Sequence, residues 1–138
     1  MAKKYNVAVV GATGMVGQTM VDVLVERNFP MAGLKLLASA RSKDLKIKVG
    51  DREYPVEEAR PQSFAGVDFA FFSAGEAISR ELAPEAVRHG AIVIDNSNAF
   101  RMEKDVPLVV PEVNPETVHQ HRGIIANPNC STIQMVVA

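Results

Sequence analysis

The sequence predicts an α/β fold: a doubly wound, mostly parallel sheet with helices on both faces. Short apolar runs rich in β-branched residues alternate with segments of helical periodicity, which is the pattern of a parallel sheet covered on both sides. The connections are short, and no internal repeat, low-complexity tract or interdomain linker interrupts them. The length of 138 residues is typical of one domain.

The first strand and helix give the clearest signal. Tyr5–Val10 is short and apolar and precedes a Gly-rich turn, which predicts a buried strand. The period changes at Gly14, and the apolar spacing that follows predicts one buried face of a helix ending near residues 28–30. The residues expected on that face are Val16, Met20, Val23 and Leu24.

The middle of the chain predicts four further strands. Leu34–Ala38 is a second buried strand, and Val67–Phe72 is another. Between them, Leu45–Val49 and Glu53–Val56 flank Gly50-Asp51, which predicts a hairpin at the margin of the sheet.

A second helix follows, with Gly90 placed where a C-terminal glycine cap belongs. Its expected buried face continues past Pro84 and consists of Ile78, Leu82, Ala86 and Val87. The remaining expected elements are strands at Ala91–Asp95, Pro107–Val110 and Gly123–Ala126 and an apolar helix over Cys130–Ala138.

Composition excludes several classes of protein. Fifteen Lys and Arg against sixteen Asp and Glu give a net charge of −1, without blocks of like charge, so we expect no nucleic-acid partner. No apolar run is long enough to span a membrane, and the N-terminus is unlike a signal peptide. A single Cys rules out an intrachain disulfide framework. We therefore expect a cytoplasmic protein.

The Gly-rich turn carries the first functional signal. A G-x-x-G-x-x-G element between a strand and a helix allows close approach of a pyrophosphate to the backbone and to the free N–H groups of the helix. This context favours a Rossmann-type dinucleotide site over a simple turn. The residues expected at the cofactor are Gly11, Thr13, Gly14, Met15, Val16 and Gly17.

The end of the second strand favours NADP over NAD. An acidic residue usually binds the ribose hydroxyls of NAD at this point, but here Ser39, Arg41 and Ser42 occur with no acid before Asp44. Arg41 and two hydroxyls would pair with a 2′-phosphate, which a carboxylate would repel. The alternative is that Arg41 is only a solvated loop charge.

Cys130 lies where a strand is expected to turn into a helix, after Asn127-Pro128-Asn129. A helix N-terminus favours a thiolate, which a nucleophilic cysteine requires. A lone free Cys is also a common buried small hydrophobe, and spacing alone does not decide between the two.

Two other groups of residues are weaker candidates. His119 and His121 lack the further ligands of a zinc site, so we expect no metal and interpret them as surface residues. Arg101 follows a polar stretch after a strand, where loops of open α/β sheets carry ligands. From its position alone, Arg101 is either an anion-binding residue or a solvated one.

Taken together, five blocks resemble the aspartate-β-semialdehyde dehydrogenase family over the whole chain. The related N-acetyl-γ-glutamyl-phosphate reductases match less well, and short-chain dehydrogenases would need a Tyr-x-x-x-Lys pair that neither Tyr5 nor Tyr54 provides. The blocks are GATGMVG (Gly11–Gly17), Ser73-Ala74-Gly75, DNSNAFRM (Asp95–Met102), VVPEVN (Val109–Asn114) and NPNCST (Asn127–Thr132).

The resemblance implies a Rossmann-type fold and NADPH-dependent reduction of L-aspartyl-4-phosphate to L-aspartate-4-semialdehyde and phosphate, on the way to lysine, threonine, methionine and diaminopimelate. It implies a thioester on Cys130, phosphate binding by Arg101 and Asn98, and substrate placement by Asn129. It also implies contact of the cofactor with Ser73, Ala74 and Gly75, and a homodimer or dimer of dimers.

The chain departs from that family in length, because family members are more than twice as long and carry the general base in their second part. None of His89, His119 or His121 matches a family catalytic position. We therefore expect an N-terminal portion, with residues 1–129 forming the dinucleotide-binding domain and residues 130–138 beginning the helix into a catalytic and dimerisation domain. A module that binds NADP without catalysis is the alternative.

Overall fold

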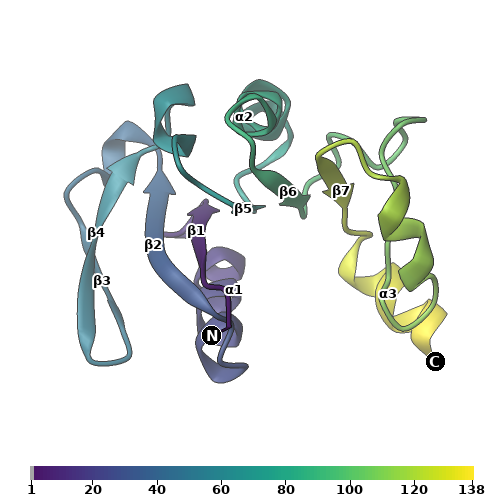
Figure 1. Ribbon diagram of the computed structural model, residues 1–138, viewed down its shortest axis with the longest axis horizontal. Helices are drawn as coiled ribbons and strands as arrows, with labels where there is room; N and C mark the ends of the chain where they lie inside the picture. The colour runs from purple at the N-terminus through teal and green to yellow at the C-terminus, as the bar shows by residue number, and fades with distance from the viewer. Residues whose placement is uncertain (1) are drawn as a thin grey trace.

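The computed structural model describes residues 2–138 and shows a single seven-stranded sheet with helices against it (Figure 1). The α-helices are α1 (Met15–Glu26), α2 (Glu76–Arg88) and α3 (Cys130–Val137). Short 3₁₀ helices are η1 (Ala40–Ser42), η2 (Pro61–Phe64) and η3 (Pro115–Gln120). The strands are β1 (Tyr5–Val10), β2 (Met31–Ala38), β3 (Lys46–Val49), β4 (Arg52–Glu58), β5 (Phe69–Phe72), β6 (Ile92–Asp95) and β7 (Ile124–Ala126).

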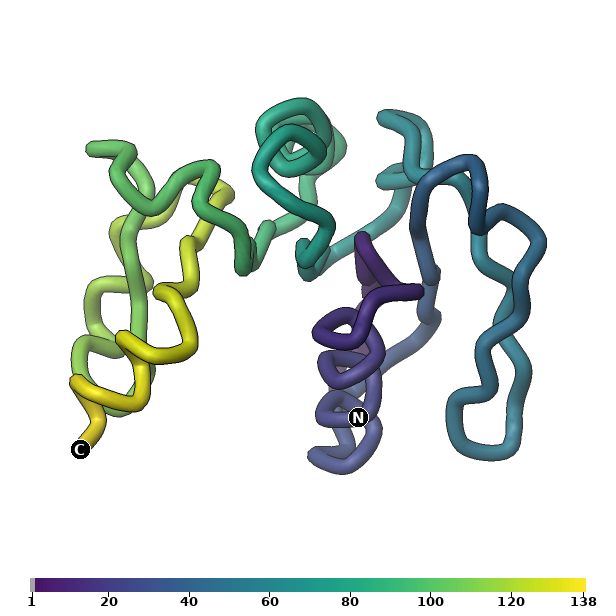
Figure 2. Tube along the Cα trace, turned by 180° about the vertical axis from the view of Figure 1, so that it is seen from behind, coloured from purple at the N-terminus to yellow at the C-terminus, as the bar shows by residue number. Residues whose placement is uncertain are grey.

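The strand order is β3-β4-β2-β1-β5-β6-β7. Six strands pair in parallel, and only β3 pairs antiparallel with its hairpin partner β4. The order reverses direction on either side of β1, as in a doubly wound sheet. The predicted fold class is therefore confirmed, including the hairpin at the margin. Figure 2 shows this hairpin and α3 at opposite ends of the molecule.

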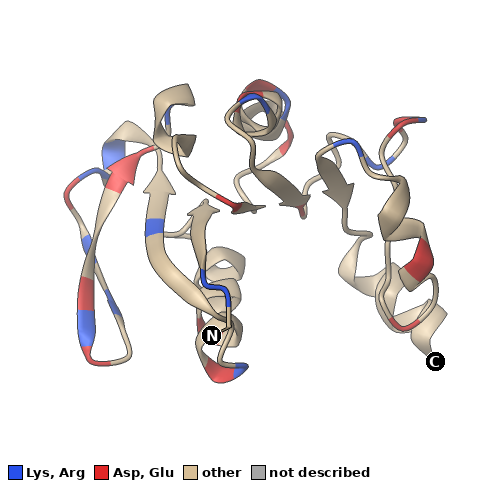
Figure 3. Cartoon of the chain, viewed as in Figure 1, with Lys and Arg blue, Asp and Glu red and all other residues tan. Residues whose placement is uncertain are grey.

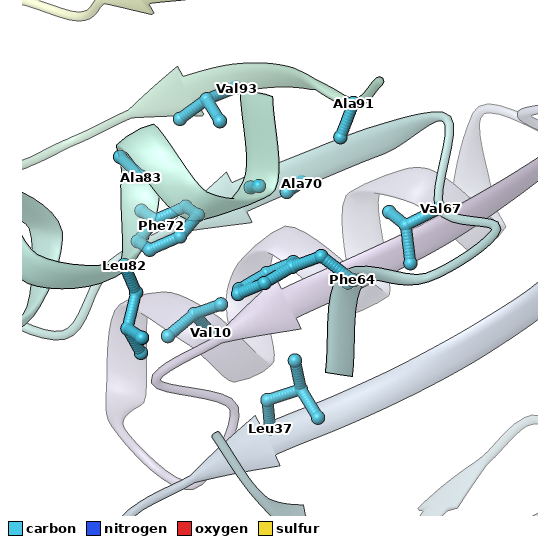
Figure 4. Packing of buried hydrophobic residues seen from close by; sticks show 12 residues of the cluster. Val10, Leu37, Phe64, Val67, Ala70, Phe72, Leu82, Ala83, Ala91 and Val93 are labelled. Carbon is cyan, nitrogen blue, oxygen red and sulfur yellow. The ribbon is translucent and has the colours of Figure 1, made fainter. Parts of the chain in front are cut away.

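The helices cover opposite faces of the sheet, with α1 on one side and α2 on the other (Figure 1). The α2 face contains a core in which Phe64 stacks on Phe72 with ring centroids 5.7 Å apart (Figure 4). Leu82, Ala83 and Ala86 of α2 close this core from above. The two apolar faces explain why the central strands are apolar along their whole length, rather than alternating.

The buried face of α1 differs from the prediction. Leu24 is buried as predicted, but its buried companions are Gly17 and Val21, whereas Val16 and Val23 are nearly half exposed. Both sets have helical spacing, and α1 is apolar on more than one side, so periodicity could not choose between them. The small Gly17 decides the orientation, because the helix contacts the Gly-rich turn closely only at a residue without a side chain.

Two smaller predictions also need correction. In α2 the buried residues are Ser79, Leu82, Ala83 and Ala86, while Ile78 is exposed at the edge of a pocket. The segment Pro107–Val110 makes only an isolated bridge from Leu108 to Ala126, not a strand. Two proline residues bracket this segment at positions 107 and 111, and each lacks the N–H that a strand ladder uses.

Charged residues of both signs are interspersed over the outer elements, while α3 carries none (Figure 3). On the edge strand β3, Lys46 and Lys48 are exposed. No helix within residues 2–138 combines the length and apolar character needed to cross a bilayer.

Candidate active site

Two pockets lie at the carboxyl ends of the parallel strands, where ligands bind in open α/β sheets. The first has a volume of about 510 Å³, within the range of small-molecule sites. It is lined by the Gly-rich turn, the ends of β2 and β4, and the start of the β5–α2 connection. The predicted cofactor residues that line it are Gly11, Thr13, Gly14, Ser39, Ser73 and Ala74.

The backbone of the Gly-rich turn packs so closely against its neighbours that two of its glycines leave no room for a Cβ. Gly11 has φ of +89°, and a Cβ there would lie 2.3 Å from the carbonyl oxygen of Ser73. A Cβ on Gly17 would lie 2.0 Å from the carbonyl oxygen of Gly11. Gly14 caps α1, and no side chain occupies the N-cap role. Gly14, which directly precedes the free N–H groups of the helix N-terminus, lines the first pocket, a position suited to a pyrophosphate.

Not every predicted cofactor residue lines the first pocket. Met15 is 86% exposed, and Val16 and Gly75 line the second pocket instead. Arg41 and Ser42 form the single turn η1, directly after Ser39. Within residues 2–138, no carboxylate forms an ion pair with Arg41, so its charge is directed to solvent beside the pocket.

The second pocket brings together residues from four separate segments. It is lined by the start of α1, the start of α2, the loop after β6 and the segment leading into α3. This arrangement unites all four residues proposed for substrate chemistry, which lie up to 32 positions apart in the chain: Asn98, Arg101, Asn129 and Cys130. The two pockets are neighbours, because different residues of the Gly-rich turn and of the β5–α2 connection line each of them.

Arg101 is held by three neutral oxygen atoms. Its Nε donates to the carbonyl of Asn127 at 2.7 Å, Nη1 donates to Oδ1 of Asn98 at 2.6 Å, and Nη2 donates to the carbonyl of Asn96 at 3.3 Å. No carboxylate within residues 2–138 pairs with it. The guanidinium is therefore fixed in place while its positive charge stays available to an anionic ligand.

The other charged residue of this pocket is already neutralised. Glu76 accepts from Arg80 at 3.2 Å in an i,i+4 pair, and Arg80 also lies 3.7 Å from Glu103. The second pocket therefore offers one guanidinium, that of Arg101, which has no carboxylate partner within residues 2–138 and suits a phosphate or a carboxylate.

The loop that carries Arg101 is fixed by a buried carboxylate. Asp95 is fully buried at the end of β6 and accepts three hydrogen bonds: from Oγ of Ser79 at 2.9 Å, and from the backbone N–H and Oγ of Ser97 at 3.1 and 2.8 Å. Ser97 Oγ in turn accepts from the N–H of Ala99. These bonds satisfy the buried charge and set the path of the loop.

Cys130 is the first residue of α3 and is exposed. The side chain of Asn129 caps this helix by accepting from the N–H of Ser131 at 2.9 Å. The structure therefore rejects the interpretation of Cys130 as a buried small hydrophobe. It places the thiol at a helix N-terminus, in the pocket that contains Arg101.

Sequence reasoning missed several residues of these pockets. Asn96 and Asn127 join the two polar loops through a 2.8 Å bond from Nδ2 of Asn127 to Oδ1 of Asn96. Both asparagines belong to polar runs that directly follow strands, which is the signal that could have singled them out. Glu58 and Glu81 in the first pocket gave no such signal, because strand pairing and helix docking bring them there.

His119 and His121 lie in and just after η3, away from both pockets. Nδ1 of His121 accepts from the N–H of Gly123. Over residues 2–138, no cluster of three or more His, Cys, Asp or Glu side chains could hold a metal ion.

The parallel sheet, the glycine turn and the adjoining cysteine pocket define a dinucleotide-binding domain of the dehydrogenase class. Residues 6–121 match the family described as semialdehyde dehydrogenase, NAD binding domain, and the chain belongs to that family.

Relatives share this domain at high identity. The chain is 59% identical over 138 residues to aspartate-semialdehyde dehydrogenase of Bacillus subtilis, covering all of this chain and 40% of that protein. A crystal structure of aspartate semialdehyde dehydrogenase II from Vibrio cholerae, complexed with ASA, has 48% identity and a TM-score of 0.93 over 97% of this chain and 44% of that one.

A third relative, aspartate semialdehyde dehydrogenase with NADP from Candida albicans, has 31% identity and a TM-score of 0.81. The match covers 96% of this chain and 45% of the Candida albicans chain. The chain thus spans about 40% of the length of the curated relatives it matches.

Proposed function

We propose that this chain is the nucleotide-binding and nucleophile-bearing portion of an NADP-dependent aspartate-semialdehyde dehydrogenase. The observation that carries the proposal is the second pocket, where the exposed thiol of Cys130 lies with Arg101, a guanidinium that has no carboxylate partner in residues 2–138. A nucleophile beside a fixed cation suits an acyl phosphate. The relatives that contain this domain and are named aspartate-semialdehyde dehydrogenase support the same assignment.

In this proposal each residue has a defined role. Arg101 and Asn98 hold the phosphoryl group of L-aspartyl-4-phosphate, and Asn129 fixes the start of α3 so that the thiolate of Cys130 meets the acyl carbon. A carbon–sulfur bond forms, the carbon–oxygen bond to phosphate breaks, and phosphate leaves with the electron pair. NADPH, when bound, supplies the hydride that converts the thioester to the aldehyde level. Release of L-aspartate-4-semialdehyde returns the Cys130 sulfur.

The first pocket is proposed to hold the cofactor. Gly11 and Gly14 receive the pyrophosphate at the N-terminus of α1, and Gly17 lets the helix pack closely against this turn. Ser73, Ala74 and Gly75 border the path toward Cys130. Thr13, Met15 and Val16 lie on the same turn. Ser39, Arg41 and Ser42 are proposed to take the 2′-phosphate.

We further propose that residues 1–129 form the nucleotide-binding domain and residues 130–138 begin the helix leading to a catalytic domain. A specific observation favours an NADP-binding module as the second candidate for this polypeptide alone. No histidine within residues 2–138 lines the second pocket, and its one carboxylate is paired with Arg80. A general base must therefore come from elsewhere for turnover.

The test uses the full-length enzyme containing this chain, supplied with aspartate semialdehyde, NADP and phosphate. Formation of reduced nicotinamide that requires phosphate is expected, and Cys130→Ala should abolish it. Ser131→Ala, one residue further along the same helix, is the matched control and should keep the activity. Activity that survives Cys130→Ala, or that does not need phosphate, contradicts the assignment.

A further inference from the structure

Glu58 lies in the first pocket, although it belongs to a strand that the Gly-rich turn does not touch. β4 pairs in parallel with β2, so Glu58 stands in register beside Ala38, the last residue of β2. Glu58 and Ala59 then line the same pocket as Ser39, Gly11 and Gly14, and Glu58 also borders a shallow pocket that contains Arg60. An acidic residue is thus supplied to this pocket by the neighbouring strand, whereas the end of β2 has none.

The sheet order indicates which part of a dinucleotide would reach Glu58; this step rests on the proposed function. With the pyrophosphate over the turn after β1, the adenosine ribose lies at the end of β2. Continuing in the same direction, the next strand is β4. In this arrangement the adenine base would lie beside Glu58 and Ala59, which follow the end of β2 along the first pocket.

The carboxylate of Glu58 is fixed with one oxygen free. Arg60 donates twice to Oε2, from Nε at 3.1 Å and from Nη2 at 2.5 Å. Within residues 2–138, no hydrogen bond reaches Oε1. The guanidinium also places a positive charge beside the carboxylate, which weakens the repulsion between Glu58 and a nearby 2′-phosphate.

The turn that presents this pair is itself well held. Ser63 donates from Oγ to the carbonyl of Glu58 at 3.2 Å and accepts from the N–H of Arg60 at 3.0 Å. Glu81, the other carboxylate of the pocket, lies on the exposed side of α2 and has no such support within the described residues.

We propose that Oε1 of Glu58 accepts a hydrogen bond from the exocyclic amino group of adenine, which makes Glu58 a residue that determines specificity for the base. An ionised carboxylate can only accept hydrogen bonds. It therefore favours a purine with an amino group at position 6 and disfavours one with an oxygen there, which would face the carboxylate oxygen without a proton between them.

The experiment compares NADP with nicotinamide hypoxanthine dinucleotide phosphate, which differs by an oxygen in place of that amino group. Their dissociation constants are measured by calorimetric titration of the chain. Wild type should bind NADP about 10- to 100-fold more tightly, the range expected for a hydrogen bond to a charged group. Glu58→Gln, whose amide can donate as well as accept, should reduce that ratio to about threefold or less.

Glu57→Gln is the matched control, because Glu57 is exposed and does not line the first pocket. It should keep the wild-type ratio, and circular dichroism verifies that both variants are folded. Equal binding of the two nucleotides by wild type, or an unchanged ratio in folded Glu58→Gln, overturns the role of Glu58 while leaving the nucleotide site in place. Failure of wild type to bind either nucleotide contradicts the proposed site itself, and the role of Glu58 with it.

Discussion

Nε of Arg101 donates a 2.7 Å hydrogen bond to the carbonyl oxygen of Asn127, 26 residues further along the chain. This bond joins the loop after β6 to the segment that leads into α3. The position of the only cationic side chain that lines the second pocket, among the described residues, is thereby tied to the position of the Cys130 thiol.

Arg101→Ala should destabilise the fold by about 1.5–3 kcal/mol, since it removes charged hydrogen bonds to two half-buried loops. Urea unfolding followed by circular dichroism measures the change. Arg122→Ala is the control, because Arg122 is 79% exposed and only 4.0 Å from Asp105, which predicts an effect within about 0.5 kcal/mol. Equal effects of the two substitutions would show that the Arg101 bonds do not support the loops.

Arg41→Asp should weaken NADP binding by about 1.5–3 kcal/mol and leave NAD binding almost unchanged, because only NADP carries the 2′-phosphate. Titration of each cofactor against both proteins provides the measurement. Lys46→Asp makes the same change of charge on the edge strand β3, away from the pocket, and should affect neither cofactor. If wild type binds NAD and NADP equally well, the selectivity is absent.

Cys130 should react with iodoacetamide about two to five times faster than N-acetylcysteine at pH 7, the range that a helix dipole of 0.3–1 kcal/mol gives. Mass spectrometry follows the labelling, and Cys130→Ser shows that no other residue is modified. Asn129→Ala removes the side-chain cap and should lower the rate by fraying the first turn of α3. A wild-type rate no higher than that of N-acetylcysteine would argue against an activated nucleophile.

Gly17→Ala should destabilise the protein by about 1–3 kcal/mol, although alanine is the better helix former, because its Cβ would lie 2.0 Å from the Gly11 carbonyl. Gly14→Ala is the comparison, since its nearest contact would be an ordinary 3.5 Å and the expected loss is about 1 kcal/mol or less. Thermal unfolding distinguishes them. A neutral Gly17→Ala would mean that α1 can move away from the turn.

These 138 residues alone should show no measurable phosphate-dependent formation of NADPH from aspartate semialdehyde. The chain has a nucleophile and a nucleotide pocket, but the lack of a positioned general base typically costs about 10²–10⁴-fold. Absorbance of the reduced nicotinamide provides the assay, with a full-length homologue as the positive control. Turnover within about tenfold of that homologue would contradict the assigned division of roles.

Local pattern was sufficient for most of the fold. Tyr5–Val10 is a strand with the expected bounds, the hairpin around Gly50-Asp51 forms, and α3 begins at Cys130. These elements have one dominant signal each: an apolar run, a turn dipeptide or the change from a strand to an apolar helix. The sequence predicted the class of sheet but not the order of its strands, because the pairing of strands depends on which apolar faces meet in space.

Residues of the candidate site were predictable where they lie in a polar segment directly after a strand. Arg101 and Cys130 each follow a strand in a polar segment, and the structure places them in one pocket. The same reasoning could not find Ser79 or Glu58. Ser79 is a polar residue on the buried face of α2, where periodicity favours apolar ones, and Glu58 reaches its pocket through the register of β2 and β4.

Helix α2 limits how this domain can be re-engineered. Ile78 and Leu82 line the first pocket, Glu76 lines the second, and Ser79 between them donates to Asp95. A designer who changes the nucleotide preference by repacking Ile78 or Leu82 also rotates or shifts Ser79, and with it the loop that holds Arg101. Changes of cofactor preference are therefore best made on the β2–β4 side of the first pocket, where no lining residue also lines the second pocket.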